Sequence, residues 1–231
     1  MKIGIIGAMQ CETATLCSML EEAESEKISG VEYHSGKLMG HDVVIATCGI
    51  GKVFAAICAQ TMILKYSPEI IINTGVAGTL TNKLSVCDVA LSTSVVQHDM
   101  DTSAIGDPVG LISGINIIEI PASAELCKKA SDAAERASLK AVEGTIASGD
   151  VFVAEESKKA FIRETFSAIA CEMEGASIGH VCYVNSVPFV VIRAISDGGD
   201  EGAAMSYDKF VTIAAENSVQ LLCEMLKLLW N

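Results

Sequence analysis

The composition of the chain excludes several classes of protein. Half of its 231 residues are apolar, and 29 acidic against 16 basic side chains give a formal net charge of −13. So acidic a chain repels a phosphate backbone, which argues against a nucleic-acid partner, and no run of about 18 uncharged apolar residues marks a membrane span.

Apolar runs alternate with helical periodicities along the chain. Strands are expected at residues 2–8, 31–38, 43–48, 70–73, 86–96, 115–120, 142–147, 168–171 and 188–195. Helices are expected at 10–26, 52–65, 124–137, 157–166, 176–184 and 206–229, and turns at 39–42 and 75–78. This alternation predicts a three-layer α/β/α sandwich around a mixed, mainly parallel sheet, in one domain spanning residues 1–231. The apolar excess also predicts a buried subunit interface, and therefore a homo-oligomer.

The cysteines and histidines indicate neither disulfides nor metal. The nine cysteines are odd in number, no two form Cys-x-x-Cys, and several lie inside apolar stretches. This usage is typical of reduced thiols in a cytoplasmic protein. The histidines, at positions 34, 41, 98 and 180, lack the spacing of zinc ligands, so we expect them in solvated or supporting roles, with no metal.

Two glycine-rich turns only partly match nucleotide-binding motifs. Gly4-x-x-Gly7 lacks the full dinucleotide pattern and is followed by Glu12, while Val53 stands where a phosphate loop after Gly49-x-Gly51 needs Ser or Thr. Tight strand-to-helix turns are therefore favoured over a nucleotide site. Phe152, just past a predicted strand, fits either a core position or a wall on which a flat base stacks.

Three carboxylates lie where apolar strands pass into loops or helices, which is the rim where open α/β sheets bind ligands. Glu12 is either a helix-end acid or a base beside a water molecule. Glu174 is either a helix-start acid or a bidentate acceptor for the vicinal hydroxyls of a ribose. Asp197 ends a strand expected to be buried, where desolvation would raise its pKa and let it donate a proton, with Ser196 orienting it. Together they suggest acid/base chemistry on a neutral or cationic small molecule.

In combination, the motifs closely resemble those of bacterial 5′-methylthioadenosine/S-adenosylhomocysteine nucleosidases, a branch of the nucleoside phosphorylase I superfamily. The segments that carry the resemblance are KIGIIGAMQCE (2–12), INTGVAG (72–78), SGDVF (148–152), EMEGA (172–176), VVIRAISD (190–197) and SYDKF (206–210). The resemblance runs from the first residue to the last predicted helix.

The resemblance implies that water displaces adenine from 5′-methylthioadenosine or S-adenosylhomocysteine, without cofactor or metal. Asp197 would protonate N7 of adenine, Glu12 would activate the water, and Glu174 would hold the ribose hydroxyls. The other implied binding residues are Met9, Ile50 and Tyr207 at the 5′-thioalkyl group, Phe152 and Val153 at adenine, Met173 at the sugar, Val76, Ala77 and Gly78 in the second motif, and Arg193 and Ser196 behind the acids. In a homodimer, Thr102, Ile105 and Pro108 would complete the pocket of the neighbouring subunit.

One position departs from the family pattern, and two rival functions stay open. Val76 stands where many of these nucleosidases carry serine. In a few relatives that carry Gly-Val-Ala-Gly at this place, the enzyme also takes 6-amino-6-deoxyfutalosine. The resemblance therefore makes that nucleoside a second candidate substrate here, and 5′-deoxyadenosine is a third. The rivals are a purine nucleoside phosphorylase, disfavoured because Glu12 would repel phosphate, and a nucleoside-binding protein without catalysis.

Overall fold

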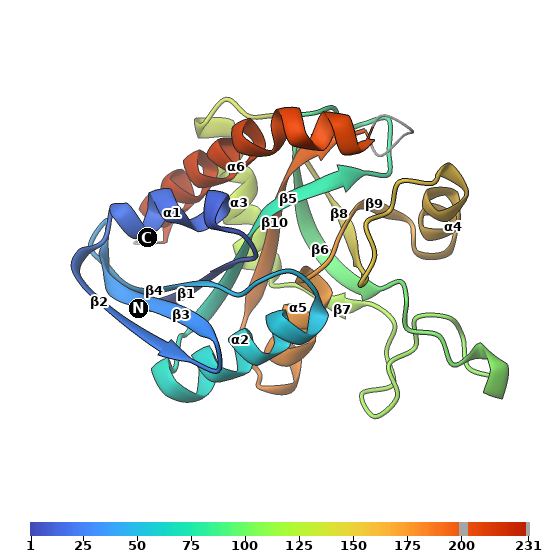
Figure 1. The fold of residues 1–231 in the computed structure, drawn as a ribbon, viewed down its shortest axis with the longest axis horizontal. Coiled ribbons are helices and arrows are strands. Elements are labelled where there is room, and N and C mark those ends of the chain that lie inside the picture. Colours follow the sequence, from blue (N-terminus) through green and yellow to red (C-terminus); the bar gives the residue numbers. More distant parts are fainter. Residues whose placement is uncertain (199–202, 230–231) are drawn as a thin grey trace.

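A mixed sheet forms the centre of the computed structural model, which describes residues 1–198 and 203–229, with the backbone alone at 203–209. Its strands follow the order β10-β6-β8-β9-β5-β1-β4-β3-β2, with β7 beside β6 (Figure 1). The strands are β1 (Lys2–Gly7), β2 (Glu21–Ile28), β3 (Val31–Leu38), β4 (His41–Thr47), β5 (Ile70–Thr79), β6 (Val89–Gln97), β7 (Ile120–Pro121), β8 (Ala141–Ser148), β9 (Ala168–Glu172) and β10 (Phe189–Asp197).

The long strand β5 closes part of this sheet into a ring. Its first half pairs in parallel with β1, almost its whole length pairs in parallel with β10, and its end pairs antiparallel with β9. Because β10 also pairs with β6, and β6 with β8, strands β5, β10, β6, β8 and β9 form a closed circuit. The carboxyl ends of β1, β5, β8, β9 and β10 are thereby brought around one small space.

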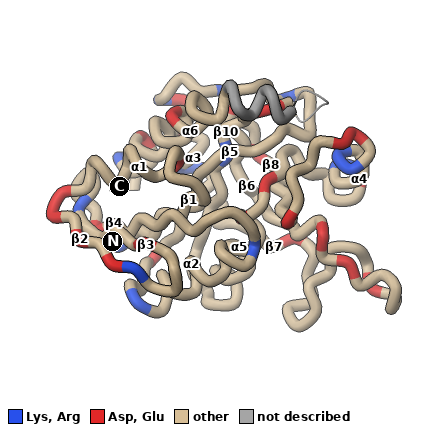
Figure 2. The backbone as a smooth tube through the Cα atoms, in the orientation of Figure 1, with Lys and Arg blue, Asp and Glu red and all other residues tan. Residues whose placement is uncertain are grey.

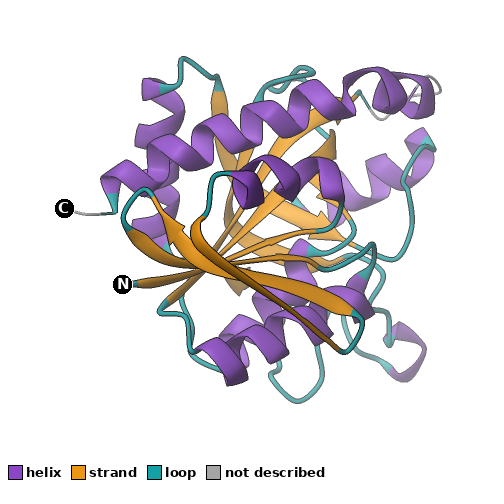
Figure 3. Ribbon diagram, turned by 60° about the vertical axis from the view of Figure 1, so that its left-hand side comes forward, coloured by secondary structure: helices purple, strands orange, loops and turns teal. Residues whose placement is uncertain are grey.

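Helices cover both faces of the sheet, as Figure 3 shows, which confirms the predicted three-layer α/β/α arrangement. The helices α1 (Gln10–Ser18), α3 (Ala124–Arg136) and α6 (Ala203–Leu228) pack together on one face. On the other face, α2 (Lys52–Tyr66) packs against α5 (Gly175–Val184), while α4 (Glu156–Phe166) lies against β8 and β9. Each face has its own apolar core, made of the β-branched side chains of the strands and the apolar sides of these helices.

The predicted helix at residues 10–26 is wrong in its second half. Helix α1 ends at Ser18, and residues 21–28 form the edge strand β2, which pairs antiparallel with β3. The turn between the two strands is made by Ser29 and Gly30, both with positive φ (52° and 84°). Pairing with β3 overrides the helix propensity of this glutamate-rich segment, and its exposed charges protect the edge of the sheet from other chains.

Two further predictions at strand positions are wrong. The expected turn at 75–78 is the continuation of β5, and of the expected strand at 115–120 only Ile120 belongs to the sheet. Residues 112 and 117 instead form an isolated bridge within the loop between β6 and β7. That loop projects from the body of the molecule (Figure 1).

Acidic residues are spread over the whole chain, including β2, the neighbourhood of α4 and the loop between β6 and β7 (Figure 2). Among the described helices, none is both long enough and apolar enough to cross a membrane.

Candidate active site

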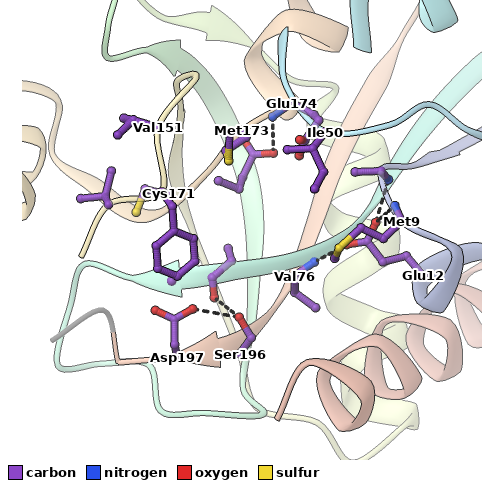
Figure 4. Close-up of a pocket in the computed structure, with 16 residues that line it drawn as sticks. Met9, Glu12, Ile50, Val76, Val151, Cys171, Met173, Glu174, Ser196 and Asp197 are labelled. Carbon is purple, nitrogen blue, oxygen red and sulfur yellow. Dashed lines mark hydrogen bonds between the residues drawn. The ribbon is translucent and has the colours of Figure 1, made fainter. Parts of the chain in front are cut away.

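A cavity of about 320 Å³ opens at the carboxyl ends of the ring strands (Figure 4). Most of its lining is apolar, as in pockets that bind small molecules. The lining residues are Ala8, Met9, Glu12, Ile50, Val76, Ala77, Gly78, Val151, Phe152, Val153, Cys171, Glu172, Met173, Glu174, Ser196 and Asp197. Twelve of the seventeen site residues predicted from the sequence are among them. The three acids are described first.

Glu12 lies in the first turn of α1 and is almost fully buried. One carboxylate oxygen, Oε2, accepts the amides of Ala8 (2.7 Å) and Met9 (2.9 Å), and the other accepts the amide of Val76 (3.1 Å). Burial nevertheless raises the pKa of Glu12, although the Arg193 charge and the three amides act in the opposite direction. A carboxylate that is held in place and whose pKa is raised is a stronger base, so it is suited to accept a proton from a bound water.

Glycines in β5 let the acids approach the strand. A Cβ atom at position 75 would lie 2.6 Å from Oε1 of Glu12, and one at position 78 would lie 2.9 Å from Oδ1 of Asp197. The glycines that sequence reasoning assigned to a turn therefore serve close packing of two carboxylates against an extended backbone.

Asp197 is the last residue of β10, and it is 2% exposed. The hydroxyl of Ser196 donates to its Oδ2 at 2.9 Å. Figure 4 shows Asp197 and Glu12 at two ends of the cavity, with Val76 between them. The pocket thus presents one carboxyl group on each side of any molecule that fills it.

Glu174 is the N-cap residue of α5, and its Oε1 accepts the amide of Gly51 at 2.8 Å. Burial and the neighbouring charge of Glu172 raise the pKa of Glu174 to about 7. Met173 and Ile50 lie close to Glu174 at the same side of the cavity (Figure 4). A flat hydroxylated ligand would meet a carboxylate and two apolar side chains there.

Arg193 lies behind the pocket and does not line it, because its side chain is fully buried against Glu172 and Asn73. Its Nη2 donates to Glu172 Oε2 at 2.5 Å and to Asn73 Oδ1 at 2.7 Å, and lies 3.9 Å from Glu174. Although burial opposes ionisation of Glu172, the Arg193 charge and several hydrogen bonds hold its pKa below the usual range. Arg193 thus supports the carboxylates from behind.

Phe152 and Ile50 stand at the mouth of the cavity, where they are 47% and 55% exposed. The alternative of a core position for Phe152 is therefore wrong. Val153, the next residue, is buried in the wall, and Met9, Ala77 and Gly78 also lie in the lining.

Besides Arg193, three predicted binding residues are not part of this lining. Thr102, Ile105 and Pro108 belong to the projecting loop, and Ile105 is 82% exposed. The side chain of Tyr207 lies outside the described residues. Conversely, sequence reasoning missed Ala8, Val151, Cys171 and Glu172. All of these except Cys171 carried a signal, because each lies inside one of the motifs on which the resemblance rests.

The backbone amides of the turn at 49–52 bind carboxylates of the protein itself and not a phosphate. This supports the interpretation of its glycines as residues of a tight turn. Gly49 and Gly51 both have positive φ (93° and 100°). The amides of Gly51 and Lys52 donate to Glu174 and Asp150, so these donors are already occupied. Of the two roles expected for the histidines, solvated or supporting, only the supporting one fits His41 and His98, because both are buried.

Comparison with known proteins agrees with this geometry. Residues 2–227 match the family described as the phosphorylase superfamily. The 5′-methylthioadenosine/S-adenosylhomocysteine nucleosidase of Shewanella halifaxensis is 38% identical, over 98% of this chain and 99% of that protein. The nucleosidase of the same name from Neisseria meningitidis, in complex with methylthio-immucillin-A, superposes with a TM-score of 0.94 at 36% identity, over 98% of each chain.

A structure described as futalosine hydrolase from Helicobacter pylori superposes equally well, with a TM-score of 0.94 at 36% identity over 98% of this chain and 97% of that one. These similarities cover almost the whole chain and far exceed what a shared fold alone produces. The chain belongs to the phosphorylase superfamily and, within it, to the family of 5′-methylthioadenosine/S-adenosylhomocysteine nucleosidases.

Proposed function

We propose that this chain hydrolyses the N-ribosidic bond of 5′-methylthioadenosine and S-adenosylhomocysteine, releasing adenine and the 5′-thio sugar. The observation that carries the proposal is the placement of Glu12 and Asp197 at two ends of one cavity, with Glu174 between the walls. One carboxyl group can act on the leaving base while the other acts on water at the opposite side of the sugar. This is the arrangement of inverting glycosidases.

The electrostatics of the pocket suit the bond cleavage. As the bond breaks, positive charge develops on the ribosyl ring and negative charge on the purine. Asp197, as general acid, would protonate N7 of adenine, and Glu12 would take a proton from the attacking water. Glu174 would accept both ribose hydroxyls, with Met173 against the sugar and Phe152 stacked on the base.

Hydrolysis is favoured over phosphorolysis because the position proposed for the attacking water is acidic. Glu12 is buried there and accepts the nearby amides of Ala8, Met9 and Val76, which a phosphate ion would need for itself. Two like charges about 4 Å apart cost on the order of 1–4 kcal/mol at the higher effective dielectric constants. Water carries no such penalty.

An adenine-release assay tests the proposal. The purified chain, given methylthioadenosine or adenosylhomocysteine, should release adenine and a free sugar at the same rate with and without phosphate. A sugar 1-phosphate formed only when phosphate is present would identify a phosphorylase instead. Binding of the nucleoside without release of adenine would identify a binding protein.

A second substrate, 6-amino-6-deoxyfutalosine, is proposed because the Helicobacter pylori protein of nearly identical fold is described as a futalosine hydrolase. Val76 agrees with this proposal, because it is the residue that this chain shares with the relatives that take this nucleoside. It lines the pocket and packs with Ala194, Ala214 and Ala215 as part of an apolar cluster. The same assay with this nucleoside decides the matter, because adenine is released only if the larger 5′-substituent is accepted. 5′-Deoxyadenosine belongs in the same series.

We also infer that the working form is a cytoplasmic homodimer of single-domain subunits. One side of α2 exposes Val53, Ile57 and Leu64, and the adjacent helix α5 exposes Tyr183 and Val184. Apolar side chains in such a continuous area are typical of a subunit interface. We propose that in this dimer Thr102, Ile105 and Pro108 of one subunit complete the pocket of the other. Light scattering at micromolar concentration tests this, and a mass near 24.2 kDa would contradict it.

A further inference from the structure

A closed ring of three hydrogen bonds lies beside the pocket mouth and joins three distant segments. The ammonium group of Lys52 donates to Asp99 Oδ1 at 2.6 Å, and the amide of Asp150 donates to Asp99 Oδ2 at 2.9 Å. The ring is completed by the amide of Lys52, which donates to Asp150 Oδ1 at 2.7 Å. None of these three residues lines the cavity.

Each member of the ring is close in sequence to a part of the site. Lys52 follows Ile50 by two residues, and Asp150 precedes Phe152 by two, so that the ring joins the two exposed walls of the mouth. The intervening Gly51 donates its amide to Glu174. Displacing Lys52 would therefore also displace the donor that orients the proposed ribose-binding carboxylate.

The backbone around the ring is shaped to bring the segments together. A Cβ atom at Gly51 would lie 3.0 Å from Asp150 Oδ1, and one at Gly149 would lie 2.5 Å from the ring of His98 and 3.1 Å from Asp99 Cγ. Only glycine permits these approaches without moving the neighbouring groups. The glycines at positions 51 and 149 therefore allow the segments that carry Lys52, Asp99 and Asp150 to contact one another.

The ion pair of the ring is sheltered from solvent. The side chains of Lys52 and Asp99 are 19% and 25% exposed, and the Lys52 ammonium also donates to Gln97 at 3.3 Å. Although burial opposes ionisation, the hydrogen bonds from Lys52 and the Asp150 amide hold the pKa of Asp99 below its usual range. A charged pair with reduced solvent screening fixes geometry better than an exposed one.

We propose that Lys52 and Asp99 are positioning residues that set the spacing between the Ile50 and Phe152 walls of the pocket, and through Gly51 the orientation of Glu174. This inference rests on the proposed function. The pair touches neither the leaving base nor the water, so it acts on substrate binding more than on the chemical step.

The test compares variants of this pair with variants of a control pair. Lys52→Met keeps the alkyl stem and removes the donor, and Asp99→Asn removes the charge. Lys37 and Asp42 provide the control, because their Nζ–Oδ1 distance is also 2.6 Å and they lie on the β3–β4 hairpin, at the end of the sheet opposite the pocket. Lys37→Met and Asp42→Asn should leave both KM and kcat unchanged.

For Lys52→Met we expect KM for methylthioadenosine to rise about 5- to 20-fold, with kcat within about threefold of the unmodified chain. Lys52→Arg should recover most of the loss, and the double variant Lys52→Met/Asp99→Asn should be no worse than the poorer single one. An unchanged KM in Lys52→Met, or a loss confined to kcat, would overturn the proposal. If Asp99→Asn does not fold, Lys52→Met and its Arg counterpart carry the test.

Calorimetric titration with adenine separates this inference from the proposed function. If the unmodified chain releases no adenine from nucleosides, the proposed function fails, and the affinity for adenine still reports the wall spacing. A weaker affinity in Lys52→Met than in Lys37→Met then supports the ring, and equal affinities overturn it. A chain that neither cleaves nucleosides nor binds adenine would overturn both.

Discussion

Glu172 and Glu174 are both buried, stand two residues apart at the end of β9, and have pKa values shifted in opposite directions. Glu172 accepts hydrogen bonds from Arg193, from the Ser148 hydroxyl and from the amides of Glu174 and Gly175. Glu174 accepts the Gly51 amide, and its other oxygen lies 3.9 Å from Arg193. The pKa of Glu172 is lowered, whereas burial raises that of Glu174 to about 7.

Two different environments thus lie within a single motif: a closed region around Glu172, where protein groups surround the carboxylate, and an open region around Glu174, which faces the cavity. Around Glu172 the protein supplies a guanidinium and enough donors to stabilise a full charge, so this region is an anchor. Glu12 and Glu174 have fewer such partners, and burial raises the pKa of both. Both of these carboxylates line the cavity, where a ligand can use their remaining hydrogen-bonding capacity.

The largest effect is expected at Asp197, which lines the cavity together with Glu12 and Glu174. Asp197→Asn keeps the volume and the contact with Ser196 but cannot donate the proton that makes adenine a better leaving group. We expect kcat to fall by about 10³–10⁴-fold, with an unchanged fold by circular dichroism. Turnover close to that of the unmodified chain would remove Asp197 from the proposed mechanism.

Glu12→Gln should have the next largest effect. The amide retains an oxygen for the neighbouring backbone N–H groups, but it cannot take a proton from water. A fall in kcat of about 10²–10³-fold is expected, while the affinity for a nucleoside changes little. Single-turnover kinetics measure the rate of the chemical step, and calorimetry measures the affinity for the nucleoside. Loss of binding in this variant would instead make Glu12 a structural residue.

On the closed side, Glu172→Gln should affect stability first. It removes the closest charged partner of the buried Arg193, and breaking a buried ion pair in this way costs about 3–5 kcal/mol. Urea unfolding measures the loss, with Asp88→Asn at the partly exposed Lys140–Asp88 pair as a control expected to cost about 1 kcal/mol or less. Similar costs for the two variants would contradict the assignment of Glu172 as an anchor.

Much of the fold could be predicted because the strands are strongly apolar. The apolar runs predict β1, β8 and β10 at nearly their observed positions, and the alternation of strands with helices predicts the layers. The failures have a common physical cause: tertiary contacts decided the local structure. Pairing with β3 made a strand of residues 21–28, and packing of Glu12 and Asp197 required the glycines of β5.

The three acids could be predicted as site residues from their positions at strand ends. Their contacts and the shifts of their pKa values could not be predicted. Nothing local in the sequence indicates that Glu172 contacts Arg193, which is 21 residues away, or that Gly51 reaches Glu174 across 123 residues. The raised pKa of Glu12 also opposed the simple helix-end argument, because burial outweighs the amides and the nearby Arg193 charge. Burial is a property of the assembled sheet, and sequence position reports it only indirectly.

The smallest effect concerns the ionisation of Glu174. If only the ionised carboxylate binds the ribose hydroxyls, KM should decrease several-fold as the pH rises from about 6 to about 8, because the pKa lies at about 7. In Glu174→Gln this dependence should vanish, although KM itself is higher. A pH profile of KM for methylthioadenosine, in both proteins, measures the difference; parallel profiles would show that another group titrates.

Stability should respond to the same ionisation in the opposite direction. Because the pKa of Glu174 is raised from 4.5 to about 7 on folding, the folded chain binds more protons than the unfolded chain between these values. The free energy of unfolding should therefore rise as the pH falls from about 8 to about 5, by on the order of 2 kcal/mol relative to Glu174→Gln. Glu172 contributes the reverse, since its lowered pKa stabilises the fold above the unfolded value and that contribution is lost only in more acidic solution. Urea titrations between about pH 5 and 8 thus measure the contribution of Glu174 apart from that of Glu172. If the free energy of unfolding depends on pH in the same way in Glu174→Gln and in the unmodified chain, Glu174 does not have the raised pKa that distinguishes it from Glu172.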